Sequence, residues 1–231
     1  MLPTRRPTPS RTPHPPTEGP ARHDWRVNDG VDLPVPGEID DLIDRQWERL
    51  RRPGTWFDGA ERVAIADAAR HGAGDGPAAV AARRIHDEPA TITRDWLSAL
   101  EAEGLTLAEY VEVLGVVSQL RAVDTFEFAV GRAMRPLPDP LDGDPSHESV
   151  DDASIDGAWV PTVGLAFPPT ILSSVRAENE AMHDVHEVLY LAPRAGDGYT
   201  MGNMSVVRDG LRRTQMEFVA ARTSLVNDCF F

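Results

Sequence analysis

The stretch TLAEYVEVLGVVSQLRAVDTF, residues 106–126, contains the longest uninterrupted helical pattern in the chain. Thr106 and Glu109 have the spacing of a capping box, in which each residue's side chain bonds the backbone of the other. Apolar residues then recur at three- and four-residue intervals, at Leu107, Val111, Leu114, Val117, Leu120, Val123 and Phe126. This repeat predicts a helix over 107–130, ended by Gly131, and its apolar length makes it the central core helix.

Helical patterns also lie on both sides of this stretch. Before it, they cover 38–50, 58–71, a short segment through Val80 and Ile85, and a segment that Thr93 caps and Gly104 ends. After it, they cover 170–191 and 214–226. We find no alternating strand pattern, so the sequence predicts an all-α fold.

Composition divides the chain into four parts. Residues 1–37 are rich in Pro, Thr and Arg and are expected to be a disordered leader. Residues 38–134 form a first helical unit. Residues 135–169 are rich in proline and acids and form a connector. Residues 170–231 begin a second unit.

Charge and cysteine usage exclude several classes of protein. The net charge is −14, which disfavours nucleic acid as a general partner. No apolar run is long enough to span a membrane, and no secretory signal is visible. Cys229 is the single cysteine, so an internal disulfide is excluded and a cytoplasmic location is expected.

The last residues, LRRTQMEFVAARTSLVNDCFF at 211–231, carry the chemical signal. Glu217 stands twelve positions before Cys229, and Asn227 stands two before it. This pattern resembles the active-site signature of the alkylhydroperoxidase D-like, or carboxymuconolactone decarboxylase-like, superfamily. Weaker similarities to two-unit members include TWFDGAERVA at 55–64, YVEVLGVV at 110–117 and AWVP at 158–161, so that the resemblance covers residues 47–231.

The resemblance implies a helical bundle and a thiol-dependent peroxidase. In this family the second cysteine of a Cys-x-x-Cys pair attacks a hydroperoxide, and the first resolves the sulfenic acid to a disulfide. Cys229 matches the resolving cysteine, and Glu217 matches the carboxylate of the proton relay. The resemblance further implies an external thiol reductant, homo-oligomers, and neither a cofactor nor a metal.

The attacking residue of the family signature would follow Phe231, so the chain is expected to be an inactive, incomplete version of the motif. A truncated gene, a mutation to a stop codon, or an in-frame UGA codon for selenocysteine would each explain this ending. A selenol is an attractive nucleophile because it is ionised at neutral pH.

Other candidate residues favour structural roles. Glu61 is the first-unit counterpart of Glu217, but Ala73 and Gly76 occupy the two redox positions, so this unit is expected to be degenerate and Glu61 structural. His183, His186 and Glu187 are expected to be solvent-facing side chains instead of metal ligands. Two alternative functions stay open: a lyase of the carboxymuconolactone decarboxylase branch, and a non-catalytic helical oligomerisation module.

Overall fold

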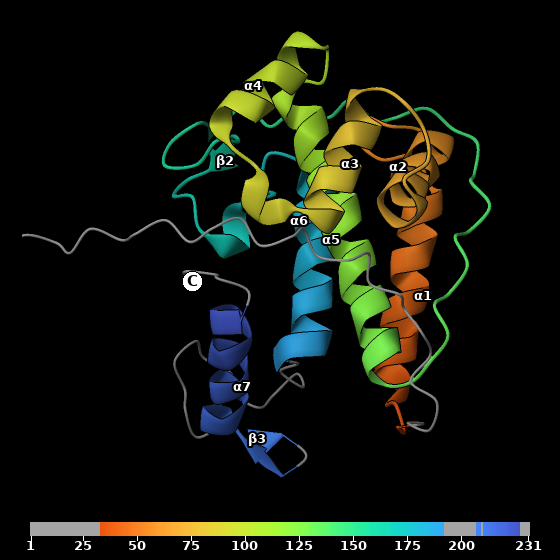
Figure 1. Ribbon diagram of the computed structural model, residues 1–231, viewed down its shortest axis with the longest axis vertical. Helices are drawn as coiled ribbons and strands as arrows, with labels where there is room; N and C mark the ends of the chain where they lie inside the picture. The colour runs from red at the N-terminus through yellow and green to blue at the C-terminus, as the bar shows by residue number, and fades with distance from the viewer. Residues whose placement is uncertain (1–32, 192–206, 209, 227–231) are drawn as a thin grey trace, which may run out of the picture.

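The computed structural model describes residues 33–191, 207–208 and 210–226, and within them the fold is all-α, as predicted. The helices in chain order are α1 (Gly37–Arg51), α2 (Gly59–His71), α3 (Pro77–Asp87), α4 (Arg94–Ala102), α5 (Leu107–Ala129), α6 (Arg176–His186) and α7 (Arg213–Val226). Figure 1 shows α5 at the centre of the bundle and α7 at one edge. The predicted leader lies outside the described residues, except for its last five.

The capping signals are confirmed where the sequence predicted them. Asp58 and Glu61 form a capping box at the start of α2, and Thr106 and Glu109 form another at the start of α5. Gly72 ends α2 in the left-handed conformation, with φ of 74°. These local hydrogen bonds are readable from sequence because each partner lies within three residues of the other.

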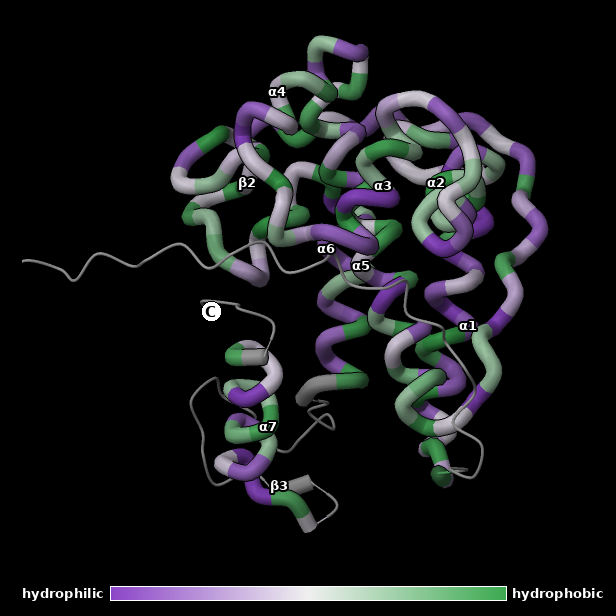
Figure 2. The backbone as a smooth tube through the Cα atoms, in the orientation of Figure 1, coloured by the Kyte–Doolittle hydropathy of each residue, from purple (hydrophilic) through white to green (hydrophobic). Residues whose placement is uncertain are grey.

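The core surrounds α5, which packs against α1, α2, α3 and α6. Its fully buried side chains include Leu42 and Ile43 from α1, Val111, Val113, Val117 and Val123 from α5, and Leu172 and Val175 from the turn before α6. Figure 2 shows the alternation of apolar and polar residues along these helices. In the described residues we find no helix with both the length and the apolar character needed to cross a membrane.

The helix predicted over 170–191 is shorter than expected. Residues Pro168–Thr170 form a 3₁₀ turn, α6 starts only at Arg176, and Glu187–Leu191 form a π-helical turn. Residues 171–175 form turns in which Ser173 donates its hydroxyl to the carbonyl of Thr170 at 2.6 Å and accepts the N–H of Val163 at 2.7 Å. The side chain of Thr170 accepts the N–H of Phe167 and so stabilises the turn locally.

The structure also contains two small antiparallel hairpins that the sequence did not predict. In the first, β1 (Ala153–Ser154) pairs with β2 (Thr162–Val163), and in the second, β3 (Val207–Arg208) pairs with β4 (Leu211–Arg212). Two residues per strand are too few to show an alternating pattern.

The connector is attached along the bundle by backbone hydrogen bonds. The N–H groups of Leu141, Ser146 and His147 donate to the carbonyls of Arg51, Gly54 and Thr55, at 2.7, 3.0 and 2.8 Å. Figure 1 shows this segment running along the side of α1. The start of the connector therefore forms part of the packed structure.

Gly115 allows α6 to approach α5 closely. A Cβ at this position would lie 2.7 Å from the Cβ of Glu178, closer than side-chain carbons pack. We expect Gly115→Ala to lower the free energy of unfolding by about 1–3 kcal/mol, since the clash outweighs the better helix propensity of alanine.

Denaturant unfolding measures this effect, and Gly37→Ala is the control because a Cβ there meets no atom within 4 Å. Equal or greater stability of Gly115→Ala would contradict the close contact of α5 and α6.

Candidate functional site

The structure places Glu217, the predicted relay carboxylate, in the second turn of α7. Its side chain is 35 % exposed and accepts a hydrogen bond from the guanidinium of Arg213, one turn earlier on the same helix. Arg213 is itself buried. Cys229 lies outside the described residues, so the structure does not test whether the two predicted site residues share a pocket.

The outer face of α7 is apolar and exposed. Phe218, Val219 and Leu225 are 74 %, 64 % and 66 % exposed. Phe218 and Leu225 are seven residues apart and therefore lie on the same side of the helix. Exposed apolar side chains gathered on one face are typical of an interaction surface.

The two histidines of α6 have different surroundings. His183 contacts the carbonyl oxygen of Pro169 through Nε2 at 3.1 Å. Burial lowers the pKa of His186, and the positive charges of His183 and Arg213 lower it further. Within the described residues, no three His, Cys, Asp or Glu side chains are grouped closely enough to hold a metal ion.

One deeply buried polar cluster was not predicted from the sequence. Arg62 of α2 donates through Nη1 to Glu112 of α5 and, at 2.7 Å, to Glu178 of α6. Gln119 of α5 donates to the second oxygen of Glu178 at 2.8 Å. The side chains of Arg62, Glu112 and Glu178 are at most 5 % exposed. One guanidinium thus joins three helices inside the core.

Backbone groups also contribute to this cluster. Glu112 accepts the N–H groups of Thr55 and Trp56, at 3.1 and 2.6 Å. A Cβ at Gly54 would collide with both the Glu112 carboxylate and the Arg62 guanidinium, so only glycine fits there. The corner between α1 and α2 is therefore folded around the carboxylate of Glu112.

Burial and charge act in opposite directions on this cluster. Burial opposes the charged form of Arg62, but Glu178 and Glu112 outweigh it and raise the pKa of the guanidinium. Burial also raises the pKa of Glu112, assisted by the negative charge of Glu178 and opposed by Arg62. Buried charges of this kind stabilise the fold only while each charged group keeps its counter-ion, so the loss of one partner destabilises the others.

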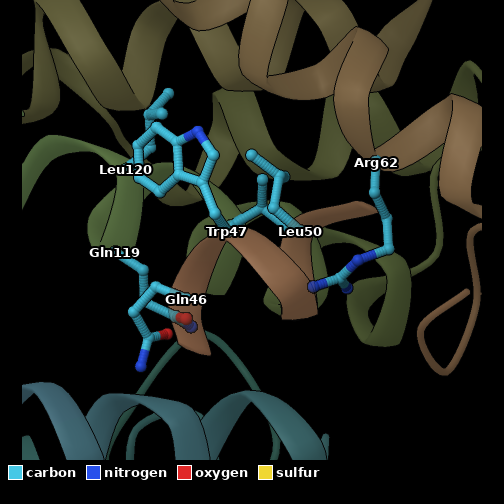
Figure 3. A pocket seen from close by; sticks show the side chains of 7 residues that line it. Gln46, Trp47, Leu50, Arg62, Gln119 and Leu120 are labelled. Atoms are coloured by element: carbon cyan, nitrogen blue, oxygen red, sulfur yellow. The ribbon is translucent and has the colours of Figure 1, made fainter. Parts of the chain in front are cut away.

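A small cavity lies beside the cluster, between α1, α2 and α5. Its lining includes Gln46, Trp47 and Leu50 of α1, with Arg62 and Gln119, as Figure 3 shows. The cavity volume of about 20 Å³ has room for about one water molecule. Because the space is too small for an organic substrate, we assign the cluster a structural role.

A second polar cluster holds the other end of α6. Asp184 accepts hydrogen bonds from Arg45 at 2.8 and 3.2 Å, from Arg49 at 2.8 Å and from Gln46 at 3.1 Å. Burial disfavours ionisation of Asp184, but the two arginines outweigh it and hold the pKa of the carboxyl below its ordinary value. Together, Glu178 and Asp184 fasten α6 to the other helices.

Glu61 has the structural role that the sequence analysis assigned to it. Its carboxylate accepts the N–H of Asp58 at 2.9 Å in the capping box of α2. Glu61 also lines a surface groove with Gly74 and Asp75, beside the first-unit positions Ala73 and Gly76.

The sequence did contain one signal for the buried cluster. Glu112 and Gln119 are polar residues seven positions apart within the mostly apolar stretch 110–120, and seven positions make two turns. Polar side chains on a core-facing stripe require buried partners. The identity of those partners, Arg62 and Glu178, depends on packing between distant segments.

Comparisons of the chain with protein-family models, with curated proteins and with solved structures give no match.

We expect Arg62→Ala to lower the free energy of unfolding by about 3–5 kcal/mol, because two carboxylates would remain buried without their cation. Arg52→Ala is the matched control: Arg52 pairs with Glu48 on the exposed side of α1, with side chains 62 % and 43 % exposed. It should change stability by less than about 1 kcal/mol. Similar losses for the two variants in denaturant titrations would contradict the assigned importance of the buried cluster.

The contribution of Asp184 should depend on pH. A lowered folded-state pKa stabilises the fold above the ordinary pKa of 3.8, and this stabilisation is lost as the pH falls through the folded-state value. At pH 7, Asp184→Asn should lower the free energy of unfolding by about 1 kcal/mol, a modest value because its arginine partners are partly exposed.

The difference between Asp184→Asn and the unsubstituted chain should therefore shrink below pH 4 in thermal unfolding. Glu180→Gln, an exposed change on the same helix, is the control. A difference that stays constant between pH 7 and pH 2 would show that Asp184 does not act through its charge.

Proposed function

We propose that the chain belongs to a thiol-dependent hydroperoxide reductase of the alkylhydroperoxidase D-like type, with Cys229 as the resolving thiol and Glu217 as the relay carboxylate. The observation that carries this proposal is the spacing of Glu217, Asn227 and Cys229 in the sequence. The all-α fold and the position of Glu217 on a helix are compatible with it.

The proposed reaction has two steps in addition to reduction by an external dithiol. A thiolate, or a selenolate, attacks the outer oxygen of the hydroperoxide, the O–O bond breaks, and the alcohol leaves with a proton. The Cys229 thiol then attacks the resulting sulfenic or selenenic acid, forming the disulfide or selenylsulfide and releasing water. The attacking group belongs to the residue that the resemblance expects after Phe231.

Glu217 suits the relay because it is partly exposed and already oriented by Arg213. A carboxylate at such a position takes up the proton of an attacking thiol and returns it to the leaving oxygen. Twelve residues of continuous helix would separate Glu217 from Cys229 by about 18 Å, at 1.5 Å per residue. Because α7 continues to Val226, only three residues remain for the return to Cys229, and they span at most about 11 Å, so the proposal requires Glu217 and Cys229 to communicate through bridging water.

A cross-linking experiment tests this proximity in the chain itself. In Glu217→Cys, a bis-maleimide with a spacer of about 10 Å, the reach of three extended residues, should join the new thiol to Cys229 within one chain, because a water-mediated relay keeps the two side chains near each other. Gln215→Cys is the control, since residue 215 lies on the opposite side of α7. An absence of the cross-link in Glu217→Cys, or equal cross-linking of both variants, would exclude a relay between Glu217 and Cys229.

An activity assay completes the test. The chain continued through the codons downstream of Phe231 should consume an alkyl hydroperoxide with a dithiol reductant, and Glu217→Gln should lower the rate by about 10²–10⁴-fold. Glu180→Gln should not change it. Cys229→Ser should prevent formation of the disulfide or selenylsulfide.

The exposed apolar face of α7 favours one other function, a helical association module. If the continued chain consumes no hydroperoxide but sediments as an oligomer that Phe218→Glu dissociates, that function replaces the reductase.

A further inference from the structure

A groove of about 200 Å³ lies between α2, α3 and the loop that joins them. Its apolar surface comes from Phe57, Ala64, Ile65, Ala78 and Ala79. Phe57 and Ile65 are buried, and the three alanines are partly or fully exposed. Because alanines occupy positions where larger side chains would fill the space, the groove remains open to a ligand of a few heavy atoms. Drug-sized ligands need roughly 300–1,000 Å³.

Two carboxylates line the rim of this groove. Glu61 and Asp75 are both exposed. The capping box of α2 fixes the position of Glu61, whose Oε2 accepts the N–H of Asp58. The nearby cation, Arg83, is directed at the loop backbone and donates to the carbonyls of Ala73 and Gly74 at 3.0 and 2.8 Å.

We propose that this groove binds a small organic cation, an ammonium group on a short apolar body. The apolar body lies on the alanines, and the ammonium group faces Glu61 and Asp75. An anion is repelled by the two carboxylates, and a neutral molecule of the same shape gains only the apolar contact. The inference is independent of the redox proposal, because neither Glu217 nor any other residue of α7 is among the described residues that line the groove.

Titration of the ¹⁵N-labelled chain with cyclohexylammonium, cyclohexanol and cyclohexanecarboxylate tests the proposal. Shifts of amide signals should be confined to the groove, at residues such as Ala64, Gly74 and Ala79. Cyclohexylammonium should bind about three- to tenfold more tightly than cyclohexanol, as expected for an exposed ion pair. This preference should decrease as salt is added, and the carboxylate should not bind.

Substitutions distinguish the contribution of the carboxylates to the affinity from that of the apolar surface of the groove. Asp75→Asn should lower the affinity for cyclohexylammonium toward that for cyclohexanol, whereas Asp95→Asn, an exposed change on α4, should leave it unchanged. Ala79→Leu should abolish binding of both ligands by filling the groove. If cyclohexylammonium and cyclohexanol bind equally, if no ligand shifts the groove signals, or if the two Asp→Asn variants behave alike, the proposal is overturned.

Discussion

The fold depends on one guanidinium, that of Arg62, which lies between the carboxylates of Glu112 and Glu178. Charges buried this deeply stabilise a structure only when their geometry and hydrogen bonds are complete. Completing them positions three helices at once, because each partner belongs to a different one. Two of the close approaches of the backbone, at Gly54 and Gly115, occur where it must come near these same side chains. The cluster therefore specifies how α2, α5 and α6 meet, while the apolar residues around it provide most of the buried surface.

The carboxyl-terminal end of α6 has charged groups that interact with α1 and α7. Asp184 joins α6 to two arginines of α1, and His186 lies within the electrostatic influence of Arg213 on α7. Arg213 in turn holds Glu217. The charge of Arg213 thus acts on α6, and its hydrogen bond orients the carboxylate that we propose for proton transfer.

Local features of the fold could be predicted from the sequence, and long-range ones could not. The capping boxes at Asp58 and Thr106 depend on residues three positions apart, so their spacing alone reveals them. The late start of α6 was missed because Ser173 bonds to the distant Val163 and to the carbonyl of Thr170, contacts that the apolar pattern of 170–191 does not reveal. The partners of Arg62 were missed because a sequence pattern shows that a buried polar group needs a partner without showing which one. For the redox motif, the spacing of Glu217 and Cys229 remains a prediction, since Cys229 lies outside the described residues.

The distance in sequence between Arg62 and its two partners affects how the chain folds during synthesis on the ribosome. Glu112 follows Arg62 by 50 residues and Glu178 follows it by 116. At roughly 5–20 residues per second, the ribosome needs roughly 6–23 s to translate from Arg62 to Glu178. During that interval the nascent α2 carries a cation destined for the core without its second counter-ion. A bundle assembled in this order reaches its final packing only after α6 has left the exit tunnel.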